Sequence, residues 1–207
     1  MIQANPSPAD DGDPRRSAIL RIARRMFMTQ GYAATRMEPI SREASISTAT
    51  LYAYFAGKAE LFTAVIDDAS GDFSRQMRVV RAASGPARQQ LTVFARAYAE
   101  FMSDPFVRSV FRLVMAERPR FQAVAMRFFE KGRSDFGAVL IAALKSLVEA
   151  GELHVEHPSW AAGQLMGMIE HPVFFVPLVT GDEVRTRRTN TQVADDAVET
   201  FLGRYAA

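Results

Sequence analysis

Hydroxyl-bearing and basic side chains gather in one short part of the sequence. Four hydroxyl-bearing residues lie close together: Thr48, Thr50, Tyr52 and Tyr54. Such hydroxyls can donate hydrogen bonds to phosphate oxygens, and threonine can also touch a thymine methyl group. Residues 15–60, which contain them, carry eight Lys and Arg against three acidic residues. A local basic excess beside small polar side chains is typical of a surface that binds a polyanion.

The formal net charge of the whole chain, +2, conceals this local excess. Residues 1–14 carry three Asp and no base, whereas residues 61–207 carry 17 charges of each sign. The sequence therefore predicts a small basic module attached to a neutral body. The chain has no cysteine, which excludes disulfides, thiolate metal sites and a cysteine nucleophile.

The apolar segments are too short to predict a membrane span. Long apolar runs such as Ala138–Leu144 reach about a third of the roughly 20 residues that a bilayer requires. The first residues, Met-Ile-Gln-Ala-Asn-Pro, lack the basic start and apolar stretch of a secretory signal. We expect a cytoplasmic protein without a membrane partner, and its 207 residues are enough for one domain or two small ones.

Three short helices are predicted around the hydroxyl cluster. The first begins at Asp13-Pro14, with the carboxylate as its cap, and ends at Gly31. Residues 35–38, Thr-Arg-Met-Glu, indicate a capping box at the start of the second. Residues 45–47 interrupt it, and a third helix follows over Thr48–Phe55. Helices this short are stable only when packed together, so we expect one compact unit.

The spacing of apolar residues assigns faces to the third helix. Leu51 and Phe55 are four positions apart and should point into a core with Phe27 and Ile40. The outward face is small and hydroxylated: Thr48, Ala49, Tyr52 and Ala53, with Thr50 and Tyr54 flanking it. Such a face suits close approach to a base edge, but on spacing alone a merely solvated helix surface explains it equally well.

Three basic residues stand at predicted helix starts, where the helix dipole disfavours cations. Arg15 and Arg16 fall in the first turn of the first helix, and Lys58 begins the helix that follows the cluster. A bound phosphate would relieve this conflict. We therefore expect these bases to clamp phosphate groups.

From Gly31 to Phe62 the sequence resembles the DNA-binding domain of the TetR family of transcriptional regulators. The distinctive part corresponds to the family's pattern L-Y-x-H/Y-F-x-x-K-x-x-L-F and reads Leu51-Tyr52-Ala53-Tyr54-Phe55-Ala56-Gly57-Lys58-Ala59-Glu60-Leu61-Phe62. The chain departs from the family at Ser45, where a turn glycine is usual, and at Thr48-Ala49, where Lys-Gly is usual. A left-handed Ser45 would cost about 1 kcal/mol relative to glycine.

The resemblance implies DNA contacts at both ends of the interrupted helix pair. At the start of the second helix it implies Thr35 and Arg36. On and around the third helix it implies Ser47, Thr48, Ala49, Thr50, Tyr52 and Tyr54, and Lys58 completes the set. Of these, we expect Thr48 and Thr50 to reach base edges and Tyr52, Tyr54 and Lys58 to contact phosphates.

The rest of the chain is predicted to be helical as well, which makes the fold all-α. Helices are expected near 58–81, 87–103, 105–117, 120–132, 135–150, 158–179 and 191–205, and only Leu153–Glu156 has a weak strand pattern. We expect a disordered tail over 1–13 and a three-helix helix-turn-helix domain over 14–60. The tract from Met115 to Pro158 is similar to AefR-like C-terminal domains, which implies a helical ligand-binding and dimerisation domain over 61–207.

The last two predicted helices carry features of an interface. The helix over 193–205 has a wide apolar stripe, and Gly163 and Gly167 permit close approach of another helix. The resemblance implies that these helices pair with their twins in a homodimer, whereas spacing alone favours a seam within one chain. Pro172 and Pro177 are expected to kink the helix over 158–179.

The resemblance also implies an effector pocket between the helices of the body. Its candidates by position are Tyr98, Phe101, Met102, Met115, Phe128, Met166 and His171, most of which we expect to be simply core. His154 and His157 have no further ligand in local spacing, so we expect neither a metal site nor a cofactor.

The sequence contains none of the common catalytic or nucleotide-binding motifs, and we do not expect an enzyme. The expected function is that of a ligand-responsive DNA-binding regulator, a repressor that a small apolar effector releases from a palindromic operator. The alternative is a helical small-molecule-binding or scaffold protein with a degenerate helix-turn-helix.

Overall fold

The computed structural model describes residues 13–76, 84–181, 183–184 and 187–207. Residues 1–12 of the tail expected over 1–13 and the expected end of the helix over 58–81 therefore lie outside the described residues, whereas Asp13 is described as the cap of α1. The chain divides into two compact units, one comprising Met1–Ala69 with Leu113–Ala125 and the other Ser70–Arg112 with Met126–Ala207. The functional boundary expected between residues 60 and 61 stays a prediction.

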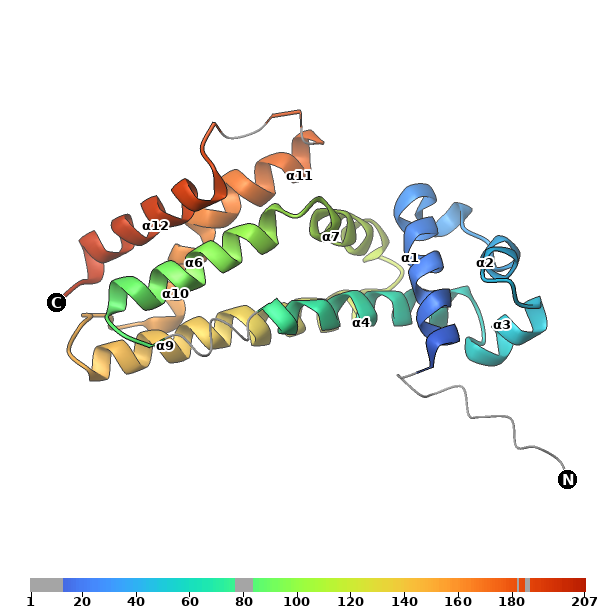
Figure 1. Ribbon diagram of the computed structural model, residues 1–207, viewed down its shortest axis with the longest axis horizontal. Coiled ribbons are helices and arrows are strands. Elements are labelled where there is room, and N and C mark those ends of the chain that lie inside the picture. Colours follow the sequence, from blue (N-terminus) through green and yellow to red (C-terminus); the bar gives the residue numbers. More distant parts are fainter. Residues whose placement is uncertain (1–12, 77–83, 182, 185–186) are drawn as a thin grey trace, which may run out of the picture. The chain divides into compact units, whose positions relative to one another are not determined.

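The described residues form helices in the expected order, and the all-α fold class is confirmed (Figure 1). The first elements are α1 (Pro14–Ala34), α2 (Met37–Glu43), α3 (Thr48–Tyr54) and α4 (Lys58–Gln76). The later ones are α6 (Ala87–Ser103), α7 (Pro105–Glu117), α8 (Gln122–Gly132), η1 (Arg133–Gly137), α9 (Ala138–Glu149), α10 (Pro158–Glu170), η2 (His171–Phe175), α11 (Val176–Thr180) and α12 (Asn190–Tyr205).

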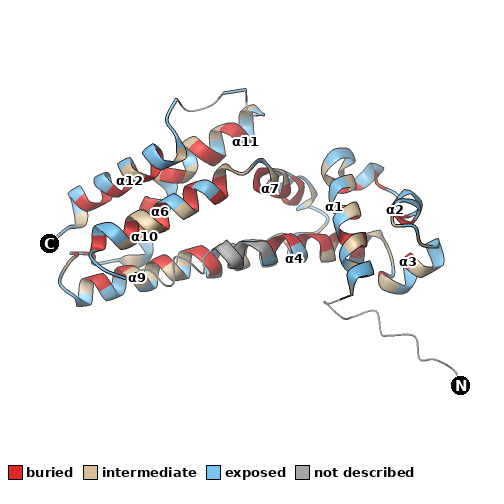
Figure 2. Cartoon of the chain, in the orientation of Figure 1, coloured by how far each residue is buried: buried red, intermediate tan, exposed pale blue. Residues whose placement is uncertain are grey.

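The first unit is built around aromatic rings. Phe27 of α1 lies edge-on to Phe62 of α4 at 5.4 Å, and Tyr32 does so at 5.3 Å. Phe121 stacks on Phe62 at 4.6 Å. Edge-to-face and stacked pairs add stability beyond their buried area, and Figure 2 shows buried positions on the inner sides of α1 and α4.

The ends of α1 follow the local sequence closely. Asp13 caps its start by accepting a hydrogen bond from the backbone N–H of Arg15 at 2.8 Å. Gly31 has φ 76 and ψ 168, so regular helical backbone is interrupted there, as predicted. The capping box expected at residues 35–38 is wrong. The Thr35 hydroxyl instead donates back to the Gly31 carbonyl, and Arg36 precedes α2 without a side-chain cap.

The turn between α2 and α3 closes with a Schellman motif. The N–H of Ser45 donates to the carbonyl of Arg42, and the N–H of Ile46 donates to that of Ser41. This motif requires a left-handed residue after the helix, usually glycine. Ser45 occupies that position with φ 54, so the turn has the strained serine that the departure from the family pattern predicts.

In the second unit, α12 packs along α6, and α10 packs against α6, α9 and α12. Leu140, Leu144, Leu165 and Ala194 are among its fully buried residues. The predicted strand at Leu153–Glu156 is reduced to an isolated bridge between Leu153 and Ala206.

At Pro172 the helix expected over 158–179 leaves regular α-helical winding. Pro172 lacks the N–H that would bond to the carbonyl four residues earlier, and the backbone there winds as the π-helical turn η2 before α11 continues. Prolines and π turns are both places where the hydrogen-bond ladder of a helix is interrupted, and whether the axis also bends stays a prediction. A second π turn, η1, joins α8 to α9.

Among the described helices, the stretch Pro158–Thr180 is long and apolar enough by composition to cross a membrane. Its best window has a mean hydropathy of 1.2 and is 33% buried inside the protein. Core helices of soluble proteins pass the same test, so length and composition are weak evidence of a span.

Candidate nucleic-acid interface

The faces of α3 agree with the spacing of its residues. Leu51 and the following Phe55 are buried, whereas four residues are exposed on the opposite side: Thr48, Ala49, Tyr52 and Ala53. Thr50 and Tyr54 are half-buried on the flanks. Ser47 begins the helix, and its hydroxyl accepts a hydrogen bond from the N–H of Thr50 at 3.0 Å. The helix thus presents a small polar face with its apolar side anchored in the unit.

The threonine hydroxyls expected to reach bases already have partners within the unit. The hydroxyl of Thr50 pairs with that of Ser47 at 2.7 Å, and the hydroxyl of Thr48 pairs with that of Ser41 at 3.2 Å. A hydroxyl both donates and accepts, so each threonine keeps hydrogen-bonding capacity for a base. These contacts also hold the two side chains in defined rotamers on the exposed face.

Two exposed donors remain without a hydrogen bond to any residue that the structure describes. Tyr52 is 50% exposed on the outward face of α3, and Arg36 is exposed at the start of α2. Both belong to side-chain types that donate to phosphate oxygens. Tyr52 and Arg36 are therefore well suited to contact a DNA backbone.

Two other residues implied as contacts have their hydroxyl groups engaged within the unit. The Thr35 side chain is 0% exposed, so its hydroxyl does not reach the surface. The Tyr54 hydroxyl donates to the carboxylate of Asp13 at 2.5 Å. This bond lowers the pKa of the Asp13 carboxyl and raises that of the Tyr54 hydroxyl, because it stabilises the ionised carboxylate and the neutral phenol together.

The ammonium group of Lys58 lies on main-chain carbonyls rather than facing outward as a phosphate clamp. It donates to the carbonyl oxygens of Tyr32 at 2.8 Å, Ala33 at 3.2 Å and Thr35 at 2.9 Å. It also lies 4.4 Å from the centre of the Tyr32 ring. An ammonium group has three N–H donors, so these bonds use them all. Lys58 thus caps the C-terminal end of α1, where unpaired carbonyls attract a cation.

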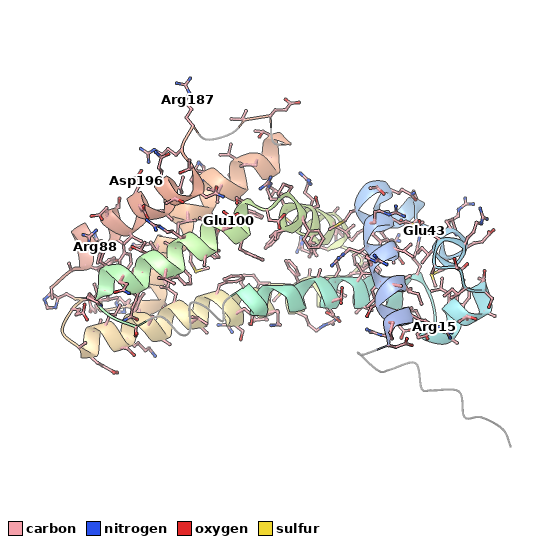
Figure 3. The ribbon with its side chains drawn as sticks, viewed as in Figure 1. Arg15, Glu43, Arg88, Glu100, Arg187 and Asp196 are labelled. Atoms are coloured by element: carbon pink, nitrogen blue, oxygen red, sulfur yellow. The ribbon has the colours of Figure 1, made fainter. Side chains whose placement is uncertain are left out.

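Ion pairs engage two of the basic side chains of the first unit. Arg25 pairs with Glu43, and Arg42 pairs with Glu38 at 2.7 Å. Figure 3 labels Glu43 at the end of α2 and Arg15 at the start of α1. Exposed pairs of this kind add little stability, but they leave fewer basic side chains for a polyanion.

The expected effector pocket is only partly supported by burial. Four candidates lie in the interior of the second unit: Tyr98, Phe101, Met102 and Phe128. Met166 is half-buried. Met115 and His171 are exposed, so burial does not support their expected places in the pocket, which stay predictions. Both lie on the outward side of their helices, a direction that apolar composition alone does not reveal.

A polar pair stands among the aromatic residues of the second unit. The Tyr98 hydroxyl donates to the Glu170 carboxylate, and the Tyr98 ring lies 5.6 Å from Phe94 and 5.3 Å from Phe136. Burial, together with the charge of Glu170, raises the pKa of Tyr98 well above its ordinary value. Tyr98 is only 3% exposed, so it keeps its proton and remains a donor.

A groove of about 350 Å³ runs between α10 and α12. Its lining is Met168, Pro172, Arg188, Val193, Asp196, Ala197 and Thr200. Beside it, the exposed side of α10 to α11 carries large apolar side chains, including Trp160 at 72% exposure and Phe175 at 52%. Large apolar side chains exposed on one stretch of helix are candidates for an interaction site.

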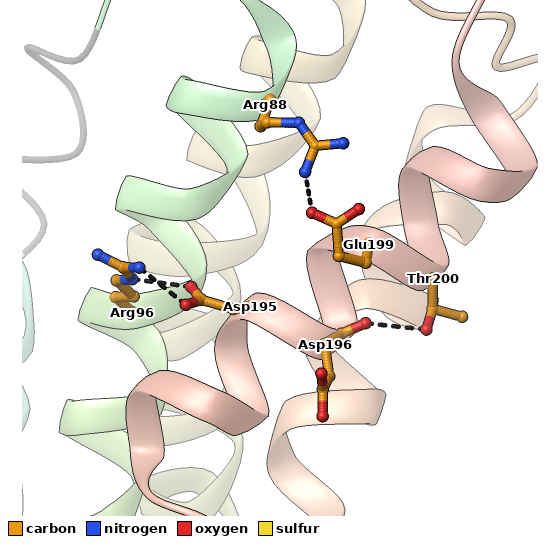
Figure 4. Close-up of polar contacts among 6 residues, drawn as sticks. All are labelled: Arg88, Arg96, Asp195, Asp196, Glu199 and Thr200. Carbon is orange, nitrogen blue, oxygen red and sulfur yellow. Dashed lines mark hydrogen bonds and ion pairs between the residues drawn. The ribbon is translucent and has the colours of Figure 1, made fainter.

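Ion pairs join α12 to α6 through residues of α12 that do not line this groove. Arg96 donates twice to the Asp195 carboxylate, at 2.8 Å each, and Arg88 pairs with Glu199 further along the two helices (Figure 4). The hydrogen bonds from Arg96 lower the pKa of Asp195. Sequence patterns gave no signal for these pairs, because their members are about a hundred positions apart.

Two family models match the chain. Residues 19–65 match the model of bacterial regulatory proteins of the tetR family, and residues 89–207 match that of the AefR-like transcriptional repressor C-terminal domain. The chain belongs to the TetR family. TetR-family proteins are transcriptional regulators rather than enzymes, so the expectation of a non-enzymatic, DNA-binding protein is confirmed.

Individual relatives agree with this family. The chain is 27% identical over 145 residues to the transcriptional repressor NicS of Pseudomonas putida, a match covering 70% of this chain and 66% of NicS. It is 30% identical over 90 residues to the transcriptional activator FasR of Mycolicibacterium smegmatis, covering 44% of this chain and 41% of FasR. The chain thus spans less than two thirds of either relative in these matches.

Among solved structures, the flavonoid-responsive regulator FrrA has the same fold. It superposes with a TM-score of 0.72 at 26% identity, over 93% of this chain and 97% of FrrA. The similarity of fold to this regulator therefore extends through both units of the chain.

Proposed function

We propose that this TetR-family protein is a repressor that binds a palindromic operator as a homodimer and is released by a small effector. The observation that carries the proposal is the exposed face of α3, where Thr48, Ala49 and Tyr52 stand on a helix whose other side is fully anchored. A helix presented in this way can enter the major groove with its N-terminal residues against base edges. Because a DNA-binding regulator acts on the genome, we also propose that the protein is cytoplasmic.

The groove and the exposed face of α10 to α11 support the homodimer. Gly163 and Gly167 lie on the exposed side of α10, and a Cβ atom added at either would meet nothing within 4 Å. These glycines leave room for a helix of a second copy, and Trp160 and Phe175 would be covered by it. A two-fold dimer of this kind would carry two copies of α3, as a palindromic operator requires.

The interior of the second unit supports an effector site. Tyr98 and Glu170 supply polar atoms among Phe94, Phe101 and Phe136, and pockets for small molecules combine an apolar lining with a few fixed polar groups. We infer an effector that is largely apolar and makes at least one hydrogen bond. It would release DNA to the extent that it favours a different arrangement of the dimer.

The operator proposal is tested by selection from a randomised duplex library about 30 base pairs long, which accommodates two half-sites one turn apart. The expected result is one enriched sequence with an inverted repeat, bound at least 100-fold more tightly than a shuffled duplex of the same composition at physiological salt. If no sequence is enriched, even at low salt, the chain is better described as a helical binding or scaffold protein with a degenerate helix-turn-helix.

The effector proposal is tested by a thermal-shift screen of apolar compounds, followed by operator-binding assays. A true effector should raise the melting temperature and lower operator affinity in the same concentration range. Glu170→Gln should weaken its binding while leaving operator affinity in the absence of effector unchanged. Operator affinity that stays constant with every compound that binds would contradict the proposed release.

A further inference from the structure

Asp13, which caps α1, also contacts α3, the helix that we propose reads DNA and call the recognition helix. One carboxylate oxygen of Asp13 accepts from the N–H of Arg15 at 2.8 Å, and the other accepts from the hydroxyl of Tyr54 at 2.5 Å. Tyr54 is the last residue of α3 and is 41 positions away. Asp13 lies before residue 19, where the match to the DNA-binding family model begins, so the family pattern assigns it no part in DNA binding.

A second contact joins the same two segments. The guanidinium of Arg16 lies 5.6 Å from the centre of the Phe55 ring, within reach of a cation–π interaction. Phe55 is buried and directly follows Tyr54. The first turn of α1 therefore touches the end of α3 at two neighbouring residues.

The contacts matter because α3 is short. A helix of seven residues is not stable by itself. Buried Leu51 and Phe55 anchor one side of α3, and Ser47 caps its start. At its end, the Tyr54 hydroxyl is bonded to Asp13 and also interacts with Arg15, which ties this end to the start of α1. Asp13 thus adds a polar restraint at the end of the helix that carries Thr48 and Thr50.

The same bond argues against a phosphate contact by Tyr54. A phenol has one proton to donate, whereas a phosphate oxygen only accepts. Moving the Tyr54 hydroxyl to a phosphate would leave the Asp13 carboxylate beside a second negative charge. Like charges at such a distance repel, although the nearby Arg15 cation attracts both groups. The preference of the hydroxyl for Asp13 therefore rests on the bond that the protein already makes.

We propose that Asp13 and Tyr54 form a latch that sets the angle of the recognition helix, which makes Asp13 a positioning residue for operator recognition. The proposal rests on the proposed function in so far as α3 reads DNA. It also changes the role of Tyr54 from a backbone contact to a partner of Asp13.

The latch should respond to pH at both ends of the scale. The pKa of Asp13 is lowered, so the contribution of the latch to stability is complete above the ordinary carboxyl range and is lost as pH falls through the lowered pKa. The pKa of Tyr54 is raised, so the contribution is complete below the ordinary tyrosine range and is lost as pH rises through the raised pKa.

The test compares four variants of the full chain on the enriched duplex and on its shuffled control. Tyr54→Phe removes the hydroxyl alone, and Asp13→Ser keeps a helix cap but is too short to hold Tyr54. Each should lower operator affinity about fivefold, the worth of one net hydrogen bond, with no change on the shuffled duplex. The double variant should lose no more than either single one. Asp13→Asn keeps one acceptor oxygen for the Arg15 N–H and has an NH2 group that can donate to the Tyr54 oxygen, so it should restore operator affinity to within about twofold of the parent protein.

A spectroscopic reading checks the bond without DNA. In ring-labelled tyrosine NMR, the Tyr54 signal, assigned by Tyr54→Phe, should ionise at higher pH in the parent protein than in Asp13→Ser. An equal pKa in both would overturn the latch. Equal losses on operator and shuffled duplexes, additive with Asp13→Ser, would overturn it in favour of a phosphate contact. If no duplex is enriched, the proposed function fails, and the NMR comparison still decides the latch.

Discussion

At the scale of single residues, side chains that a family pattern places on DNA also hold the DNA-binding unit together. Lys58 is the clearest case, because its three donors all lie on carbonyls at the end of α1. Arg36, by contrast, is exposed and has no hydrogen bond to a described residue. The exposure and hydrogen-bond partners of a basic side chain therefore decide whether its charge is available to DNA.

Lys58→Met keeps the length of the side chain but leaves the carbonyls of Tyr32, Ala33 and Thr35 without their donor. We expect the free energy of unfolding to fall by about 1–3 kcal/mol, as measured by urea denaturation. Lys145→Met, at an exposed position of α9, is the control for loss of a lysine charge and should change stability by less than about 0.5 kcal/mol.

The salt dependence of DNA binding separates Lys58 from Arg36. Arg36→Met should reduce the slope of log affinity against log salt by about one unit, as loss of a phosphate contact does. Lys58→Met should leave the slope nearly unchanged. A slope reduced by Lys58→Met, with stability intact, would return Lys58 to the phosphate clamp expected from the sequence.

At the scale of elements, the turn between α2 and α3 contains a local conflict that can be relieved. Ser45→Gly removes the left-handed strain at φ 54 and should stabilise the protein by about 1 kcal/mol, or about 2–4 °C in melting temperature for a chain of this size. Ser45→Ala retains the Cβ atom and should bring no gain. A gain from both variants would show that the hydroxyl, rather than the backbone, causes the strain.

Short-range patterns predicted the elements well and the contacts between them poorly. The spacing of Leu51 and Phe55 identified both faces of α3, because helical periodicity is a local property. The bond from Tyr54 to Asp13 spans 41 positions, and no local pattern encodes it. The inward turn of Thr35 was missed for a related reason, since its hydroxyl satisfies the Gly31 carbonyl instead of starting α2.

At the scale of the whole molecule, the second unit contains the proposed surface for assembly and the proposed effector site. Its helices were predicted within a few residues, but two of the pocket candidates, His171 and Met115 of the first unit, are exposed rather than buried. Apolar residues occur both in a buried core and on an exposed surface that binds a partner, so composition alone does not distinguish the two. Which of the two a helix face becomes depends on the packing of α6, α10 and α12, and that packing is not visible in any one segment.

Gly167→Leu tests the homodimer directly. The added side chain meets nothing within 4 Å in its own chain at the Cβ position, so the monomer should fold, whereas a partner helix at close range would be blocked. Light scattering after size exclusion should show a shift from dimer to monomer. Gly132→Leu, at a site on α8 that is equally open at the Cβ position, should remain dimeric. A dimer that survives Gly167→Leu would place the interface elsewhere.

The π turn η2 has a consequence for insertions and deletions. Trp160 and Val179 both lie on the exposed side of the stretch from α10 to α11, 19 positions apart, whereas five α-helical turns of about 3.6 residues cover about 18. The wider turn at His171–Phe175 accommodates the additional residue, so the downstream face keeps its direction. Removing one residue other than proline from this turn should give α-helical winding with the same face outward, still without the hydrogen bond that Pro172 cannot donate. Removing one residue from the middle of α12 should instead rotate the face of every residue that follows it in the helix.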